Sequence, residues 1–384
     1  MSDTPDRPES DPHDRIEWRE GDGVLCARWR AEAGQPPPRR VILADDTLRA
    51  DDAWRLACEG TAMLWQGDYQ NARQLLQALA RRADRAGRRS KAPGTLTEAF
   101  HRYRMAQAQR ARTLGMLLVP VSAGGVVPLR RAPDVAAACE AAWGDTSEDA
   151  VVSLRELLGL IGAYQWQRNG VPVAALGGRR IHPHYGVFAP VRGEYLDLVA
   201  DAPLPAGGLA FDIGTGTGVL AAILAARGVE RVVATDTSPR ALACARDNVR
   251  RLGLADRIDV RAGDGFPEGR AALVVCNPPW LPGKPSSLLD QAIYDPGSRM
   301  LRGFLAGLPA HLAEGGEGWL VLSDLAERLG LRSRDELVAW IAAAGLRVLG
   351  RLDTRPRHAR AQDASDPLHA ARQGEVTSLW RLAC

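Results

Sequence analysis

This 384-residue sequence lacks the features that define several common protein classes. Its six cysteines form no C-x-x-C pair and stand at no zinc-ligand spacing from the seven histidines, so we expect reduced thiols and no metal. No apolar run approaches the roughly 18 residues that a membrane-spanning helix needs. The first fifteen residues are rich in Asp, Pro and Ser and lack the apolar core of a signal peptide, which predicts a disordered tail over residues 1–15 and a cytoplasmic location.

Lysine is scarce, and the charge is nearly balanced. Lys91 and Lys284 are the only lysines, and a formal net charge of +3 excludes a polycation. Affinity for nucleic acid would therefore need local clustering of charge. One cluster lies between Arg73 and Arg112, where eleven basic residues stand against two acidic ones. This pattern is typical of a surface that binds RNA phosphates, and also of an ordinary solvated charged face.

Glycine, in contrast, is concentrated in the most informative stretch, residues 211–220, which read FDIGTGTGVL. Glycines at 214, 216 and 218, between two apolar runs, predict a strand that enters a tight turn and a helix that begins near Val219. The first turn of that helix offers unpaired N–H groups to a ligand with polar or anionic groups. Glycine-rich turns also occur as plain structural turns, so this stretch alone is a weak signal.

Three further strands are predicted after this turn, and each ends at a polar residue. Residues 231–235 end at Asp236, about twenty residues after the glycines, where a carboxylate could accept hydrogen bonds from both ribose hydroxyls of a nucleoside. The next strand ends at Asp264, and the strand over 271–276 leads into Asn-Pro-Pro-Trp. For both aspartates, the alternative interpretation is a helix cap or a turn residue.

These strand ends, in this order, resemble those of the class I S-adenosylmethionine-dependent methyltransferases, over roughly residues 185–384. The tetrapeptide Asn277–Trp280 is similar to the family's [Asn/Asp/Ser]-Pro-Pro-[Tyr/Phe/Trp] motif, which marks enzymes that methylate planar nitrogens: exocyclic amines of bases, or the side-chain amide of glutamine. The resemblance implies S-adenosylmethionine as the cofactor. The residues it implies as cofactor contacts are Phe188, Pro190, Asp212, Gly214, Thr215, Gly216, Gly218, Asp236, Asp264 and Asn277.

The chemistry explains why these residue types occur together. The lone pair of an amide or base amine is delocalised, so the nitrogen is a poor nucleophile until its N–H groups are held out of plane. The Asn277 side-chain oxygen and the Pro278 carbonyl could each accept one N–H, while Pro278 and Pro279 fix the backbone. Trp280 could stack on the flat target group, a contact worth about 1–3 kcal/mol per base in single-strand binders. The alternative is a rigid turn after a strand.

The alternation of helices and strands from Leu209 to Gly350 predicts an α/β fold. We expect a Rossmann-like seven-stranded, mostly parallel sheet with helices on both faces, preceded by a mainly helical α+β N-terminal domain. The predicted domains are a substrate-recognition domain over residues 16–180 and a methyltransferase domain over residues 181–384. In the N-terminal half, periodicity predicts helices over 51–64, 71–85 and 147–161, a helix that begins near Thr95, and strands over 116–122 and 126–130.

The segment before the methyltransferase domain's first strand carries two histidines and an aromatic residue. In similar methyltransferases this segment folds over the cofactor and holds its methionine end, a role that the resemblance gives to Phe188 and Pro190. His182 and His184 invite a metal or general-base interpretation, although ordinary loop histidines are the expected case.

Two methyl acceptors are compatible with the sequence, and a third interpretation involves no turnover. A base amine in ribosomal or transfer RNA is favoured by the arginine-rich block. A glutamine in a translation protein is the alternative, because Asn-Pro-Pro-aromatic followed by an acidic-Pro dipeptide, here Asp295-Pro296, is similar to the protein-glutamine methyltransferases. A non-catalytic cofactor- or RNA-binding module is disfavoured by the intact Asn277.

Overall fold

The computed structural model describes residues 15–32, 34–88, 94–191, 193–356 and 366–384. The described chain forms two compact units, the first drawn from Met1–Ala92 and Arg104–Tyr164, the second from Pro93–Tyr103 and Gln165–Cys384. Helix α3 (Leu96–Leu114) begins in the second unit and continues into the first. Apart from Arg15, the predicted tail lies outside the described residues.

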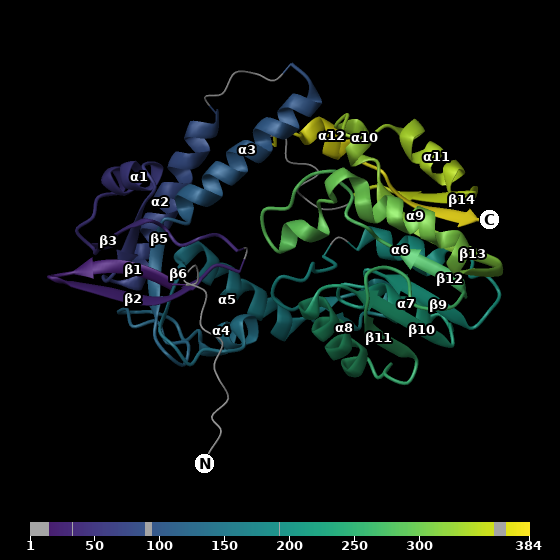
Figure 1. Cartoon of the computed structure of the whole chain (residues 1–384), viewed down its shortest axis with the longest axis horizontal. Helices are drawn as coiled ribbons and strands as arrows, with labels where there is room; N and C mark the ends of the chain where they lie inside the picture. Colours follow the sequence, from purple (N-terminus) through teal and green to yellow (C-terminus); the bar gives the residue numbers. More distant parts are fainter. Residues whose placement is uncertain (1–14, 33, 89–93, 192, 357–365) are drawn as a thin grey trace, which may run out of the picture. The chain divides into compact units, whose positions relative to one another are not determined.

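The second unit is built on a seven-stranded sheet, coloured teal to yellow in Figure 1. Its strand order is β11-β10-β9-β12-β13-β15-β14. The pairs from β11 to β13 are parallel, whereas β15 pairs antiparallel with both neighbours. The strands are β9 (Leu209–Ile213), β10 (Arg231–Asp236), β11 (Ile258–Ala262), β12 (Ala271–Cys276), β13 (Leu312–Ser323), β14 (Arg347–Thr354) and β15 (Thr377–Ala383).

Helices cover both faces of this sheet, which confirms the predicted fold class. Successive residues of β9 show why, since Ala210 packs in an apolar cluster with α6, α7 and α8, and Phe211 packs in a second cluster with α9 and α11. A strand buried on both faces needs an almost continuous apolar run. The helices of this unit are α6 (Glu194–Asp201), α7 (Val219–Ala226), α8 (Pro239–Arg251), α9 (Arg299–His311), α10 (Leu325–Arg328), α11 (Arg334–Ala343) and α12 (His369–Gln373).

Local sequence signals fix where several of these helices begin. The Ser238 hydroxyl accepts from the Ala241 N–H at 3.4 Å, and Pro239 occupies the first helical position of α8. Ser333 starts α11 with a reciprocal capping box that includes Glu336. These caps place the amino-terminal end of α8 directly after β10.

The first unit contains a six-stranded mixed sheet in the order β1-β2-β6-β5-β4-β3 (Figure 1). The residue pattern predicts only two strands here. The strands are β1 (Arg15–Glu20), β2 (Gly23–Arg30), β3 (Arg40–Ala44), β4 (Thr61–Trp65), β5 (Leu117–Val121) and β6 (Ala150–Ser153). The helices are α1 (Ala50–Cys58), α2 (Tyr69–Arg88), α4 (Ala136–Trp143) and α5 (Leu154–Asn169), which extends into the second unit.

Two predicted helices of this unit were wrong at one end, and one predicted strand was almost absent. The end of the predicted helix 51–64 is strand β4, and the start of the predicted helix 147–161 is strand β6. Every residue of both strands is buried, and periodicity alone cannot separate a short buried strand from a buried helix. The predicted strand 126–130 is reduced to one bridge between Ser122 and Val126.

A buried aspartate ties together separate segments of the first unit. Asp68 is 0% exposed, and its carboxylate accepts from the Arg131 Nε at 2.6 Å, from the Arg131 Nη2 at 2.8 Å and from the Arg130 Nε at 2.9 Å. The Gln70 backbone N–H adds a fourth bond at 2.8 Å. Arg131 has a φ of 58°, a left-handed conformation that is strained for a non-glycine residue and is held by this bidentate pair.

Candidate active site

The glycine loop lies between β9 and α7, as predicted, at the carboxyl edge of the sheet. Gly214, Gly216 and Gly218 have φ values of 72°, 56° and 81°, which L-residues with a side chain rarely adopt. A Cβ added at Gly214 would lie 2.5 Å from the Met300 Cε, whereas one at Gly216 would meet no atom within 4 Å. The backbone at Gly216 is therefore open to a ligand.

Asp212, the fourth residue of β9, carries an unpaired oxygen beside this loop. Its Oδ2 accepts from the Thr215 hydroxyl at 2.6 Å and from the Ala221 N–H at 3.1 Å. Its Oδ1 is buried and has no hydrogen-bond partner among the described residues. Burial raises the pKa of Asp212 to about 6. A cationic group brought to Oδ1 would satisfy this oxygen, and the ammonium of S-adenosylmethionine fits that need.

Asp236, at the end of β10, holds the glycine loop from the other side. Its Oδ2 accepts from the Gly216 N–H at 3.0 Å, and its Oδ1 accepts from the Ser238 N–H at 2.9 Å. Each carboxylate oxygen has a second lone pair, so two acceptor positions remain for hydroxyl groups of a ligand. Asp236 is therefore a turn residue, and the two remaining acceptor positions leave its binding role a prediction.

Asp264 follows β11 and is exposed. The loop around it is tied to the end of β10, because the Gly263 N–H donates to the Asp236 carbonyl at 3.1 Å and the Thr235 hydroxyl donates to the Gly265 carbonyl at 2.7 Å. These bonds hold Asp264 next to the strand end that carries Asp236. Contact with adenine stays a prediction.

The segment before α6 is fixed to α8 by a residue that the sequence analysis missed. Asn248 is 1% exposed, and its amide donates to the carbonyls of Thr217 and His182 at 3.1 Å while its Oδ1 accepts from the His182 N–H at 2.7 Å. It thus joins this segment to the glycine loop. A polar residue on the apolar face of a helix, three positions after Ala245, is the sequence signal that could have revealed it.

The predicted cofactor contacts of this segment differ in exposure. Phe188 is 38% exposed and Pro190 is buried. Nearby, Gly186 lies against Leu288, since a Cβ at Gly186 would be 2.9 Å from the Leu288 Cδ1. The segment therefore touches the loop that follows Asn-Pro-Pro-Trp, although the roles of Phe188 and Pro190 stay predictions.

The Asn-Pro-Pro-Trp stretch lies directly beside the glycine loop. In the parallel pairing of β12 with β9, Val275 lies opposite Asp212 and Cys276 opposite Ile213, so Asn277 emerges next to Gly214. The Trp280 indole N–H donates to the Asn277 Oδ1 at 2.9 Å. The structure thus brings Asp212, the glycines, Asp236 and Asn277 to one edge of the sheet, as the order of strand ends predicts.

The loop after Trp280 is closed at its base. The Leu281 N–H donates to the Ile293 carbonyl at 3.0 Å, and the Asp295 N–H donates to the Leu281 carbonyl at 2.9 Å. The buried Asp295 carboxylate accepts from the backbone N–H groups of Met300 and Leu301, both at 3.1 Å, at the start of α9. Asp295 therefore stabilises the helix start and fixes the end of this loop.

The first turns of α3 pack against this loop base. Ala99 and Phe100 share an apolar cluster with Leu281, and the rings of Phe100 and Tyr294 are 6.5 Å apart. The Thr97 hydroxyl donates to the Leu329 carbonyl at 2.7 Å. A helix that continues into the first unit thus contributes to the surroundings of the Asn-Pro-Pro-Trp loop.

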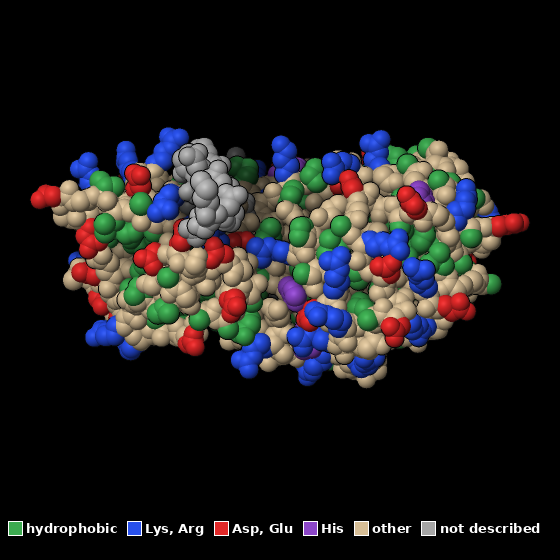
Figure 2. Space-filling model, turned by 60° about the horizontal axis from the view of Figure 1, so that its bottom comes forward, with side chains coloured by type: hydrophobic (Ala, Val, Ile, Leu, Met, Phe, Trp, Pro, Cys, Tyr) green, Lys and Arg blue, Asp and Glu red, His purple; other side chains and the backbone are tan. Residues whose placement is uncertain are grey.

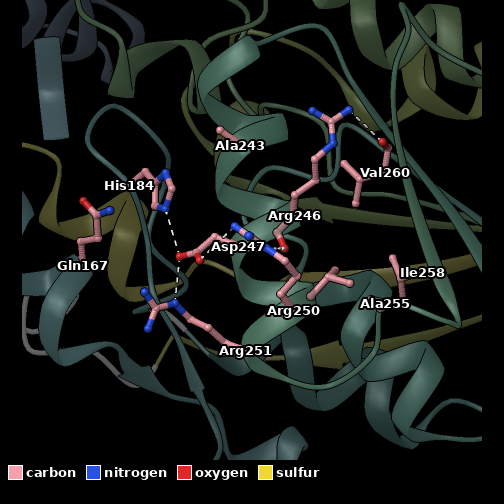
Figure 3. Close-up of a pocket in the computed structure, with 11 residues that line it drawn as sticks. Gln167, His184, Ala243, Arg246, Asp247, Arg250, Arg251, Ala255, Ile258 and Val260 are labelled. Atoms are coloured by element: carbon pink, nitrogen blue, oxygen red, sulfur yellow. Dashed lines mark hydrogen bonds and ion pairs between the residues drawn. The ribbon is translucent and has the colours of Figure 1, made fainter. Parts of the chain in front are cut away.

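The two histidines have ordinary partners. The His182 Nδ1 is 2.8 Å from the Gln167 carbonyl, and the His184 Nε2 is 3.3 Å from the Asp247 Oδ2, on which Arg251 also converges (Figure 3). No group of three potential metal ligands occurs among the described residues. Within the same described part, no helix is long and apolar enough to cross a bilayer.

His184 and Asp247 line a concavity of about 780 Å³ that is separate from the strand ends (Figure 3). Most of its lining residues belong to α8 and β11, and none belongs to the glycine loop or to the Asn-Pro-Pro-Trp stretch. Arg246, Arg250 and Arg251 line it, and Figure 2 shows basic side chains gathered over the face formed by α8 and β11. The concavity is therefore not formed by the predicted cofactor and catalytic residues.

Comparison with known proteins identifies the family. A family model described as "Methyltransferase small domain" matches residues 196–328. The release factor glutamine methyltransferase of Cereibacter sphaeroides is 33% identical over 198 residues, which cover 47% of this chain and 68% of that protein. The Xylella fastidiosa protein of the same name is 30% identical over 208 residues, covering 48% and 74%. The chain belongs to the class I S-adenosylmethionine-dependent methyltransferases and is an enzyme of that class.

Other similar proteins match over a shorter stretch or at lower sequence identity. A ribosomal protein L11 methyltransferase of Pelotomaculum thermopropionicum is 47% identical over 73 residues, which cover 18% of this chain and 24% of that protein. A solved methyltransferase from Pyrococcus furiosus is 19% identical, with a TM-score of 0.41, and the match covers 58% of this chain and 96% of that one. The chain thus spans about a quarter of the L11 methyltransferase that it matches.

Proposed function

We propose that this methyltransferase transfers a methyl group to the side-chain amide nitrogen of a glutamine in a translation protein, with a peptide-chain release factor as the first candidate. The observation that carries the proposal is the similarity to release factor glutamine methyltransferases over two thirds or more of their length. The closed loop between Asn-Pro-Pro-Trp and Asp295-Pro296 adds local support. The RNA base amine that the sequence analysis ranked first is less well supported.

The cofactor in this proposal is S-adenosylmethionine, which supplies a methyl group on a sulfonium when bound. The unpaired Asp212 Oδ1 receives its ammonium group, and the free acceptor positions of Asp236 receive the ribose hydroxyls. Thr215 acts indirectly, since its hydroxyl is bonded to Asp212. The remaining proposed contacts are Phe188, Pro190, Gly214, Gly216, Gly218, Asp264 and Asn277.

Asn277 and Pro278 prepare the target nitrogen. The Asn277 Oδ1 and the Pro278 carbonyl each accept one N–H of the amide, which turns the nitrogen lone pair out of conjugation. Bound S-adenosylmethionine would supply the methyl group to this nitrogen and leave as S-adenosylhomocysteine, and the nitrogen would lose one proton to solvent. Pro279 stiffens the turn, so little reorganisation is needed when the substrate arrives.

A base amine in RNA is the second candidate, favoured by the basic block from Arg73 to Arg112. Two of its arginines are paired with carboxylates in the first unit: the Arg82 Nη2 lies 2.6 Å from the Asp51 Oδ1, and the Arg110 Nε lies 2.9 Å from the Asp84 Oδ1. These pairs reduce the charge available to phosphates. The block also contains Arg89 and Lys91, which lie outside the described residues.

The deciding experiment offers purified enzyme and radiolabelled S-adenosylmethionine to a purified release factor and, separately, to total RNA. We expect label in the release factor, located on a glutamine by peptide mass spectrometry, and none with the Asn277→Ala enzyme. Label in RNA alone would replace the glutamine proposal with the base-amine one. Cofactor binding without transfer to either acceptor would favour a binding module.

A further inference from the structure

Trp280 makes a contact that the stacking role expected from its motif does not require. Its indole N–H donates to the Asn277 Oδ1 at 2.9 Å. The ring is partly buried and packs against both apolar clusters of the sheet. Two prolines with restricted φ values separate the partners, so the spacing between Asn277 and Trp280 is largely set by the backbone.

The contact matters because the two ends of an asparagine amide have nearly the same shape but opposite hydrogen-bonding character. The oxygen accepts two hydrogen bonds, whereas the NH₂ group only donates. An indole N–H is a donor only, so it selects the orientation in which Oδ1 faces Trp280. The second lone pair of Oδ1 stays available to a target N–H. In a flipped amide the Asn277 NH₂ group would face the Trp280 N–H, and two donors cannot form a hydrogen bond.

We propose that Trp280 is a positioning residue, whose N–H sets the orientation of the Asn277 amide so that an oxygen, not an NH₂ group, meets the target nitrogen. This inference rests on the proposed function, in which Asn277 accepts an N–H of the substrate. Phenylalanine at the same position has no donor, and the hydroxyl of tyrosine lies at the far end of its ring. The hydrogen bond is therefore particular to tryptophan.

The first test is Trp280→Phe, which keeps a flat ring and removes the N–H. We expect kcat to fall about five- to tenfold, the usual effect of losing one hydrogen bond, with the Kd for S-adenosylmethionine unchanged. Trp319→Phe is the matched control: it also removes a buried indole N–H, bonded to the Glu317 Oε2 at 2.9 Å, but within β13. The control enzyme should keep its kcat, and an equal loss there would overturn the proposal.

A double-mutant cycle separates orientation from stacking. In Asn277→Asp both ends of the side chain are oxygens, so there is no amide orientation to select. In the Asn277→Asp enzyme, adding Trp280→Phe should therefore lower kcat by less than about twofold. If Trp280→Phe lowers kcat by the same factor with Asn277 and with Asp at position 277, Trp280 acts through stacking or packing and the proposal fails. The cycle is run with whichever acceptor, protein or RNA, takes label from the unmodified enzyme.

A readout independent of activity completes the test. The ¹⁵N–¹H indole resonance that is missing in Trp280→Phe belongs to Trp280, and it should shift in Asn277→Ala and persist when S-adenosylhomocysteine is added. If the chemical shift of this resonance is the same in Asn277→Ala, the hydrogen bond is absent in solution. This NMR measurement tests the role of Trp280 separately from the proposed acceptor, because it needs no methylation of a release factor.

Discussion

Two buried aspartates, one in each unit, differ in how their hydrogen-bonding capacity and charge are satisfied. Asp68 in the first unit is fully buried, and both carboxylate oxygens have partners, chiefly Arg131, which lowers its pKa to about 2. Asp212 in the second unit is 1% exposed, leaves Oδ1 unpaired and has a pKa that burial raises to about 6.

The difference lies in what supplies the positive charge. Asp68 takes it from the protein itself, so its carboxylate stabilises the fold. Asp212 has no cation among the described residues, and an unpaired buried charge is costly. In the proposed function, the ammonium group of the cofactor relieves that cost. A buried acid at a strand end that has no cationic partner is therefore a better indication of a binding site than an acid paired with arginine.

The largest expected effect is a loss of catalysis without a loss of cofactor binding. Asn277→Ala should lower kcat by about 100-fold or more, because one of the two acceptors for the target N–H is lost. The Kd for S-adenosylmethionine, measured by calorimetry, should stay within about twofold, since Asp212 and Asp236 are intact. A parallel loss of cofactor affinity would mean that Asn277 belongs mainly to the cofactor site.

The next effect tests the unpaired oxygen directly. Asp212→Asn keeps the shape and removes the charge, and it should weaken S-adenosylmethionine binding by about 10- to 100-fold, the range for a charge-assisted hydrogen bond. Calorimetric titration of both proteins measures it. The matched variant Asp68→Asn should bind the cofactor normally while it stays folded. Unchanged affinity in Asp212→Asn would place the ammonium elsewhere.

A third effect follows from the raised pKa of Asp212. Above pH 6 the carboxylate is charged and binds the ammonium, whereas below pH 6 it takes up a proton and loses this attraction. The Kd should therefore rise by up to about tenfold for each pH unit below 6. The same titration of Asp212→Asn should be nearly flat, and a flat profile in the unmodified enzyme would contradict the assigned role.

The smallest effect concerns stability. The pKa of Asp68 is lowered in the folded state, so its contribution is present above the unfolded value of about 4 and is lost as the pH falls from about 4 towards 2. Asp68→Asn should unfold at a lower temperature at pH 7, and its unfolding midpoint should depend less on pH in that acid window. Thermal melts followed by circular dichroism test this. Equal acid sensitivity in both proteins would assign the effect to other carboxyl groups.

Much of the second unit could be predicted because its signals are local. The glycine turn, the Ser238 cap and the order of strand ends each depend on residues close in the chain, and parallel connections bring such ends to one edge. The first unit was harder to predict. Its strands β4 and β6 are short, fully buried and paired with distant partners, so their apolar runs have no period that distinguishes strand from helix.

By itself, the sequence determined the fold class, the glycine-rich loop after β9 and the position of Asn277 beside it, since each follows from short-range pattern and strand order. Only the tertiary structure decided that Asp212 keeps an oxygen without a partner, that Asn248 joins three segments, and that the Trp280 N–H meets Asn277. Even the last contact, between residues three positions apart, requires the turn to be folded. Hydrogen-bond satisfaction and burial are properties of the packed chain, because they depend on which distant groups arrive at each atom.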